Sequence, residues 1–204
     1  MFGDGTKNSF GWEIGRLGEI CDVRDGTHDT PKYHDEGYPL VTSKSVTSGE
    51  IDFSSCNLIS EEDYKKISER SGVSDGDIIM PMIGTVGKPV IVKTERKFAI
   101  KNVALIKFRE GSKVINSYIY SLLQSPYFDE MVLSKLKGGN QKFVSLSELR
   151  GLPIVVPPKS VQEKYELFRE QSDKSKFDDE IISNLNLSRC SAILLKAKSG
   201  YKKR

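Results

Sequence analysis

One segment of this chain has the composition of a phosphate-binding loop, but its spacing is wrong for that chemistry. Gly84-Thr-Val-Gly-Lys88 combines glycines with a lysine. It lacks the four-residue spacing that separates the first Gly from the Gly-Lys pair in such a loop. In addition, no Ser or Thr follows Lys88. Pro89 stands where the helix of a phosphate-binding loop would continue. We therefore expect no nucleotide site here, and no glycine fingerprint for a dinucleotide or adenosyl cofactor is visible elsewhere.

Two other groups of reactive residue types are equally incomplete. His28 and His34 share one loop, with no Cys or His at the spacing of zinc ligands. Asp63-Tyr-Lys65 could form half of a nuclease site, but it falls in a segment with the pattern of a surface helix. The sequence thus predicts no catalytic residue, no metal site and no cofactor.

Charge is unevenly distributed along the 204 residues, although the formal net charge is only +3. Residues 1–78 contain 8 Lys and Arg against 16 Asp and Glu, whereas residues 79–150 contain 12 against 5. A basic middle segment can form a surface for an anionic ligand. The same lysines could equally be solvated side chains on strands and loops.

Strand-forming segments separated by turns and short helices fill the first 158 residues. The β-branched and aromatic segments predict strands within 12–24, 39–42, 78–80, 90–93, 98–100, 103–108 and 152–156. Short helices are expected over 60–67, 116–124, 126–136 and one turn after Ser145, where Ser60 and Ser145 have the pattern of N-caps. The expected fold is an α+β domain built on a strongly bent sheet.

The remainder of the chain has a different composition, because residues 159–199 contain neither Gly nor Pro. Their absence over this length predicts one long helix, which divides the chain into a domain at 1–158 and a helix at 159–204. Ile181, Leu185, Ser188, Ala192 and Leu195 step by four and three residues, which is the pattern of a coiled-coil seam with one polar position. Such a seam requires a second helix.

Nothing in the sequence indicates export or membrane insertion. The polar N-terminus does not have the pattern of a signal peptide, and no apolar stretch approaches the roughly 20 residues of a membrane span. Cys21, Cys56 and Cys190 are scattered and odd in number, which favours a reduced, cytoplasmic protein.

Several short motifs, taken in order, resemble the specificity subunit of type I restriction–modification systems. The resemblance covers essentially the whole chain. The motifs are Trp12…Leu17-Gly-Glu-Ile20, Asp25-Gly-Thr…Thr30-Pro31, Ser48-Gly-Glu-Ile51, Asp75-Gly-Asp-Ile78, Gly84-Thr-Val-Gly87 and Leu152-Pro-Ile-Val-Val-Pro-Pro158 with Gln162. The resemblance implies a target recognition domain that reads one half of a split DNA site, followed by a spacer helix. It also implies that methylation and cleavage belong to partner subunits, the methyltransferase (modification) and restriction subunits.

The chain departs from this family pattern in having one recognition domain and one helix instead of two of each. Met1-Phe-Gly-Asp4 resembles the stretch that precedes the second domain. We therefore expect either a second-half fragment or a natural half-subunit, paired with another copy or another half. The seam Ile181, Leu185, Ala192 and Leu195 is expected to pair antiparallel with a second helix. An adaptor that binds protein through its head, without reading DNA, is the alternative.

If the resemblance holds, exposed loops of the head should contact double-stranded DNA. Polar, basic and planar side chains suit this task because they can bond phosphates and the edges of bases. The expected contacts are Thr27, His28, Lys32 and Tyr33 in a first loop, Lys44 and Ser45 in a second, Asn140, Gln141 and Lys142 in a third, and Thr85 and Lys88 in the glycine turn.

Overall fold

The computed structural model describes residues 8, 10–47, 49–84, 86, 88–132, 143–169 and 171. The chain divides into two units, Met1–Gln162 and Glu163–Arg204. In the first unit the strands are β1 (Glu13–Arg16), β2 (Asp22–Asp25), β3 (Tyr33–His34), β4 (Tyr38–Val41), β5 (Val46–Thr47), β6 (Glu50–Ile51), β7 (Asn57–Ile59), β8 (Ile78–Pro81), β9 (Val90–Ile91), β10 (Ala99–Ile100), β11 (Val103–Lys107) and β12 (Pro153–Val156).

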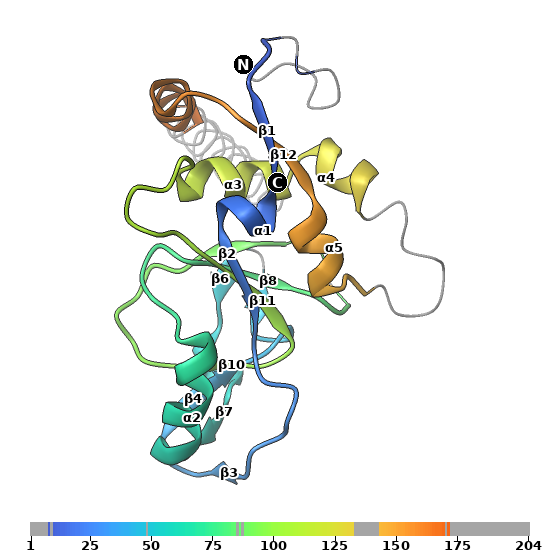
Figure 1. Ribbon diagram of the computed structural model, residues 1–204. Helices are drawn as coiled ribbons and strands as arrows, with labels where there is room; N and C mark the ends of the chain where they lie inside the picture. The colour runs from blue at the N-terminus through green and yellow to red at the C-terminus, as the bar shows by residue number, and fades with distance from the viewer. Residues whose placement is uncertain are drawn as a thin grey trace, which may run out of the picture. The chain divides into compact units, whose positions relative to one another are not determined.

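Short helices separate these strands. They are α1 (Leu17–Ile20), α2 (Glu61–Ser71), α3 (Asn116–Leu123), α4 (Pro126–Met131) and α5 (Leu146–Gly151), together with a 3₁₀ turn, η1 (Phe53–Ser55) (Figure 1). The expected N-caps are confirmed: Ser60 accepts from the backbone N–H of Asp63, and Ser145 and Glu148 form a reciprocal capping box. The α+β class is confirmed as well. The helical turn α1 was not expected.

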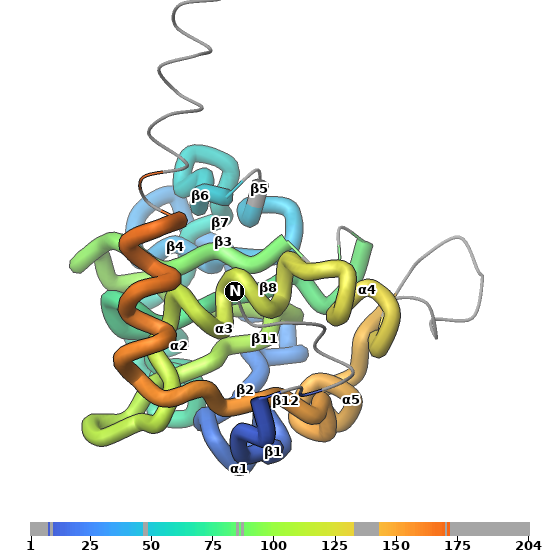
Figure 2. Tube along the Cα trace, turned by 90° about the horizontal axis from the view of Figure 1, so that it is seen from above, coloured from blue at the N-terminus to red at the C-terminus, as the bar shows by residue number. Residues whose placement is uncertain are grey.

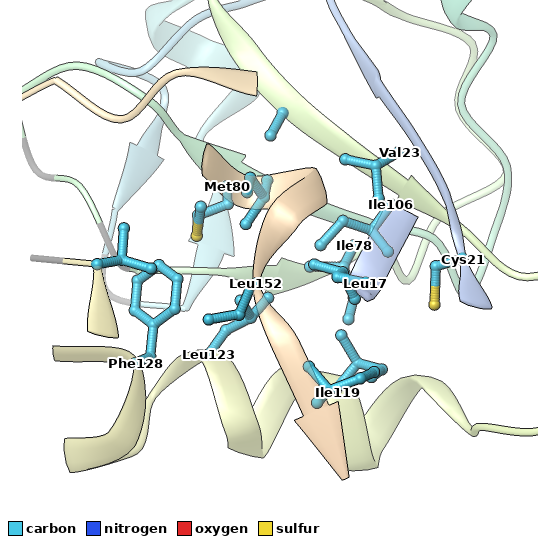
Figure 3. Packing of buried hydrophobic residues seen from close by; sticks show 14 of the residues in the cluster. Leu17, Cys21, Val23, Ile78, Met80, Ile106, Ile119, Leu123, Phe128 and Leu152 are labelled. Carbon is cyan, nitrogen blue, oxygen red and sulfur yellow. The ribbon is translucent and has the colours of Figure 1, made fainter. Parts of the chain in front are cut away.

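The first four-stranded sheet has the order β2-β11-β8-β9 and lies between two cores. Alternate residues of a strand point to opposite faces. Ala104 and Ile106 of β11 accordingly face one core, whereas Val103 and Leu105 face the other. Helices α3 and α4 cover the first face (Figures 1 and 2). Figure 3 shows Ile78 and Ile106 of this sheet close to Leu17, with Leu123 and Leu152 nearer to Phe128.

The second four-stranded sheet, ordered β10-β4-β7-β3, packs on the other face of the first. Val41 and Ile100 of this sheet share a core with Ile79 and Leu105 of the first sheet. Helix α2 covers the outer face of the second sheet, where Tyr64 stacks on Tyr38 with ring centroids 4.3 Å apart. Two small sheets, β1-β12 and β5-β6, complete the unit.

The strands therefore form separate sheets and not the single bent sheet that was expected. The chain crosses between the two four-stranded sheets more than once, and one crossing is the step from β10 to β11. Asn102 sits at this step with φ 55°, a left-handed conformation that ends extended pairing. Beside it, Gly26 lies so close to Ile100 that an added Cβ would stand 2.4 Å from the carbonyl oxygen. We call residues Lys101 and Asn102 the β10–β11 junction.

Gln162, one of the residues that carry the family resemblance, holds the end of the first unit together. It is fully buried. Its Oε1 accepts from the N–H of Ile115 at 2.9 Å, and its Nε2 donates to the carbonyls of Lys113 and Pro157 at 2.9 and 2.7 Å. Both polar atoms of this buried amide are thus hydrogen-bonded, as burial requires. The contacts lie close to the start of the helical residues 159–169.

Candidate nucleic-acid interface

The first predicted DNA-contacting loop, Thr27–Tyr33, connects β2 to β3 beside α2 (Figure 1). Its side chains are mostly accessible: Tyr33 is 45% exposed, the His28 side chain is 66% exposed, and Lys32 is also exposed. Donors and a planar ring are therefore available on this surface, as base and phosphate contacts require.

The start of this loop is fixed by backbone pairing with the β10–β11 junction. The N–H of Thr27 donates to the carbonyl of Ile100 at 3.0 Å, and the N–H of Asn102 donates to the carbonyl of Thr27 at 3.3 Å. The N–H of Gly26 donates to Val103 at 3.0 Å. Thr27 and Lys101 thus form an isolated parallel bridge. A loop exposed at its tip is in this way rigidly held at its base.

His28 bridges two groups that lie on different elements. Its Nδ1 is 3.0 Å from Oδ1 of Asn102, and its Nε2 is 2.8 Å from Oδ2 of Asp25. Both neighbours are acceptors, so an imidazolium, which donates from both nitrogens, satisfies them together. The hydrogen bonds to Asn102 and then to Asp25 raise the pKa of His28 above its ordinary value.

Arg70 of α2 completes this arrangement from the other side. Its Nη2 donates to Oδ1 of Asp25 at 2.9 Å and to the carbonyl of Gly26 at 2.8 Å. Arg24 in turn donates to the carbonyl of Arg70 at 2.7 Å. We call Asp25, His28, Arg70 and Asn102 the junction cluster. It joins β2, the first loop, α2 and the β10–β11 junction.

A pocket of 410 Å³ opens between the first loop and α2. Its walls carry charges of both signs, because Asp29 of the loop lines it together with Asp63, Lys66 and Arg70 of α2. The lining residues are Thr27, His28, Asp29, Thr30, Pro31, Asp63, Lys66, Ile67, Arg70 and Ser71. The pocket adds two cations of α2 to the surface that sequence reasoning assigned to the loop alone.

The second predicted loop, at Lys44 and Ser45, is a turn between β4 and β5. Lys44 is exposed, as a DNA contact must be. Ser45 is only 2% exposed, and its Oγ lies 3.5 Å from the N–H of Thr42. Its burial argues against a direct DNA contact and gives it a role in shaping the turn. Ser43 donates to the carbonyl of Asn102 at 3.3 Å, which links this turn to the first loop.

The residues just before the glycine turn pair with the residues that follow the third predicted loop in the sequence. Ile83 forms an antiparallel bridge with Phe143, and the N–H of Val144 donates to the carbonyl of Met82 at 2.9 Å. We call Met82–Gly84, Val86 and Lys88 together with Phe143 and Val144 the Phe143 edge. Lys88 is exposed there. Thr85, Asn140, Gln141 and Lys142 lie outside the described residues, as do Ile181, Leu185, Ala192 and Leu195 of the seam.

Sequence reasoning missed Arg70, Lys101 and Asn102. Lys101 donates from Nζ to the hydroxyl of Thr30 in the first loop, and its N–H donates to Val41 at 2.9 Å. The only local signal was the Lys-Asn pair between the apolar segments 98–100 and 103–108, which marks a turn but no partners. Arg70 gave no signal, because its partners lie more than 40 positions away in the sequence.

The described part of the chain contains no group of three or more His, Cys, Asp or Glu arranged to hold a metal ion. Nor does any helix among these residues combine the length and apolar character needed to cross a membrane.

Comparison with known proteins assigns this architecture to a family. The model of the "Type I restriction modification DNA specificity domain" matches residues 10–185. The chain is 25% identical over 154 residues to the type I restriction enzyme EcoBI specificity subunit of Escherichia coli, a match that covers 74% of this chain and 31% of that protein.

Solved structures show the same fold. The HsdS subunit from Thermoanaerobacter tengcongensis superposes with a TM-score of 0.58 at 18% identity, covering 81% of this chain and 38% of that one. A chain of a type I R-M system complex gives a TM-score of 0.59, also at 18% identity, over 81% of this chain and 39% of its own. This chain therefore spans well under half the length of the proteins that it matches. On the family match over residues 10–185, the chain belongs to the type I restriction modification DNA specificity domain family.

Proposed function

We propose that this chain is a sequence-specific DNA-recognition subunit or half-subunit of a type I restriction–modification complex. Its head reads one half of a bipartite duplex target, and methylation and cleavage are performed by methyltransferase and restriction subunits that it positions. Support comes from the family match and from the EcoBI specificity subunit as a relative.

The observation that carries the proposal is the convergence of two exposed loops on one junction. Thr27 and Ser43 come from different loops, and both hydrogen-bond to backbone atoms of Asn102. Base readout needs several side chains held in a fixed relation to one another, because a groove presents its donors and acceptors at fixed spacings. A rigid base under the exposed residues His28, Lys32, Tyr33 and Lys44 provides that relation. Lys88 at the Phe143 edge, with Thr85, Asn140, Gln141 and Lys142, extends the proposed contact surface.

Selection from a pool of random-sequence duplexes tests this function directly. The full chain is equilibrated with the pool at low and at physiological salt, and the bound duplexes are sequenced. We expect one short sequence to be enriched, and an affinity that falls steeply with salt because phosphate contacts release counterions. Binding without any enriched sequence, or no salt-dependent binding at all, would contradict the proposal and point to a protein-binding adaptor.

We further propose that a second half-subunit, either another copy or a different half, pairs with the long helix through Ile181, Leu185, Ala192 and Leu195. Over positions 161–198 a helix spans roughly 57 Å, so antiparallel pairing would separate two heads by about one and a half turns of B-DNA. Two identical halves would then read a two-fold symmetric site.

The pairing is tested by placing charges in the seam. The double variant Ile181→Glu with Leu185→Glu should convert an assembled species to a monomer while the head remains folded, as light scattering and circular dichroism would show. If the wild-type chain is already monomeric at tens of micromolar, self-pairing is wrong and the seam meets a different subunit.

A further inference from the structure

Asn102 contacts both candidate DNA-reading loops from a single position. Its side-chain Oδ1 and its N–H bond to His28 and Thr27 of the first loop. Its carbonyl accepts from Ser43 beside the second loop at 3.3 Å. In the described structure one residue that is distant in the sequence therefore hydrogen-bonds to two loops that β3 and β4 separate.

The backbone conformation of Asn102 explains why an asparagine suits this position. With φ 55° the residue lies in the left-handed region, where Asn and Gly are tolerated far better than branched side chains. Gly would allow the turn but would supply no side chain. Asn supplies both the turn and an acceptor 3.0 Å from Nδ1 of His28.

We propose that Asn102 is a positioning residue for DNA recognition, which holds the two loops in one fixed relation to each other. Protonated His28 completes this link by donating to Asn102 and Asp25, and we call these bonds the His28 clasp. The inference rests on the proposed function, because it assigns to Asn102 the geometry of the reading surface and not a contact with DNA. Asn102 acts through His28 and Ser43, and the exposed side chains of His28, Lys32, Tyr33 and Lys44 make the contacts.

The charge state of His28 follows from its surroundings. Asp25 on β2 carries the negative charge nearest to the ring, and Arg70 on α2 opposes protonation. Across the pocket, α2 also presents Asp63 and Lys66. Hydrogen bonds to Asn102 and Asp25 outweigh the effects of burial and Arg70, so the pKa of His28 is raised.

The sign of the pH dependence is fixed by this direction. A group with a raised pKa in the folded state contributes its full stabilisation below the unfolded value, which is about 6.5 for His. That contribution is lost as the pH rises through the raised folded value. The clasp is therefore closed in mildly acidic solution and opens as the pH rises, and sequence discrimination should fall with it.

Three substitutions in the full chain test the proposal. Asn102→Gly keeps the left-handed turn and removes the acceptor, whereas Asn102→Asp keeps both and serves as the rescue. The control is Asn8→Gly, which also removes an asparagine side chain from a residue with positive φ. Among the described residues, the side-chain amide of Asn8 bonds to the backbone of Trp12, which lies ahead of β1 and outside the junction cluster.

The readout is the ratio of affinities for the selected duplex and for a scrambled duplex, measured between pH 5.5 and 8.5. We expect Asn102→Gly to lower this ratio roughly threefold to tenfold, the range that a lost hydrogen bond gives, with little change on the scrambled duplex. It should also flatten the pH profile. Asn8→Gly should retain both, whereas Asn102→Asp should retain the ratio and move the pH profile to higher pH, because a second carboxylate beside His28 raises its pKa further. An unchanged ratio in Asn102→Gly, or equal losses on both duplexes, would overturn the inference.

A second measurement needs no DNA and separates this inference from the proposed function. In the free full chain, hydrogen exchange at residues 27–33 and 42–45 should accelerate in Asn102→Gly but not in Asn8→Gly. The ring signals of His28, assigned by comparison with His28→Gln, should titrate above about 6.5 in the wild type and lower in Asn102→Gly. If these results appear but no duplex sequence is enriched, the proposed function fails and the clasp stands. If they do not appear, the clasp fails whatever the DNA result.

Discussion

The junction cluster and the Phe143 edge both support predicted DNA-contacting segments, but side-chain bonds contribute differently to the two. At the junction cluster, side chains add to the backbone pairing and connect positions far apart in the sequence, such as Arg70 with Asp25 and His28 with Asn102. At the described part of the Phe143 edge, the long-range ties are backbone ones, between Met82 and Val144 and between Ile83 and Phe143. Residue identity therefore matters more at the first region than at the second.

The two regions also respond to pH in opposite directions. His28 in the junction cluster has a raised pKa, so its contribution is lost as the pH rises. Glu148 caps α5 just beyond the Phe143 edge, and its hydrogen bonds to Ser145 lower its pKa. The stabilisation from Glu148 is present above the ordinary carboxyl pKa and is lost as the pH falls through the lowered value. Rising pH should thus weaken the His28 bonds of the first region, and falling pH should weaken the Glu148 cap beside the second.

The largest contrast should come from one substitution made in each region. In Gly26→Ala the new Cβ would stand 2.4 Å from the carbonyl oxygen of Ile100, and the backbone there must shift. We expect a loss of about 2–3 kcal/mol in the free energy of unfolding, as for an overpacked site. Gly84→Ala at the Phe143 edge meets no atom within 4 Å and has only the strain of φ +78°, so about 1 kcal/mol is expected. Urea denaturation measures both, and equal losses would contradict the contrast.

A smaller loss is expected when Arg70 is replaced. Arg70→Ala removes the bonds to the Asp25 carboxylate and the Gly26 carbonyl, which should cost about 1 kcal/mol. The matched control is Lys65→Ala on the same helix, since the exposed Lys65–Glu61 pair is screened by solvent and should contribute much less to stability. Hydrogen exchange at residues 26–28 should accelerate only in Arg70→Ala. Equal exchange in the two variants would mean that Arg70 does not hold the loop.

Lysine substitutions compare the two regions as DNA contacts. Lys44→Ala and Lys88→Ala should each weaken binding to all duplexes about equally and reduce the slope of log affinity against log salt by roughly one. Fluorescence anisotropy at several salt concentrations measures this slope. A loss confined to the selected sequence would identify base readout, and an unchanged slope would remove that lysine from the interface.

The smallest effect should come from Glu148→Gln. Gln can keep the capping box with Ser145, so stability at neutral pH should change by only a few tenths of a kcal/mol. The variant should, however, lose less stability than the wild type below pH 4, because its cap no longer titrates. Thermal unfolding at pH 3.5 and pH 7 shows the difference. Parallel losses in the two proteins would indicate that Glu148 makes no contribution to the pH dependence.

Local features of this fold were predictable from the sequence because local physics fixes them. Ser60 and Ser145 begin helices as their capping patterns indicate. The predicted strand segments 78–80 and 103–108 lie in β8 and β11, except for Phe108, which follows β11. The division into separate sheets was not predictable, since it depends on which strands pair with partners distant in the sequence. The left-handed φ of Asn102 and the close approach of Gly26 to Ile100 accompany this pairing and became apparent only in the structure.

The candidate site divides in the same way. Exposed loop residues such as Lys32 and Lys44 could be identified by composition, because turn-forming polar segments lie at the surface. The buried state of Ser45 could not, since it depends on a turn in which the N–H of Asp52 donates to the Ser45 carbonyl at 2.8 Å. The roles of Arg70 and Asn102 could be recognised only when the structure showed their hydrogen-bond partners.

Methylome sequencing tests the central claim most directly. A host that carries the methyltransferase subunit is compared with and without this gene, and with a gene carrying Asn102→Gly. We predict a bipartite motif that is modified only when the chain is present, and weaker or less selective modification with the variant. The same modified motifs with and without the gene would contradict the account, because a subunit that specifies the target must change which sequences are methylated.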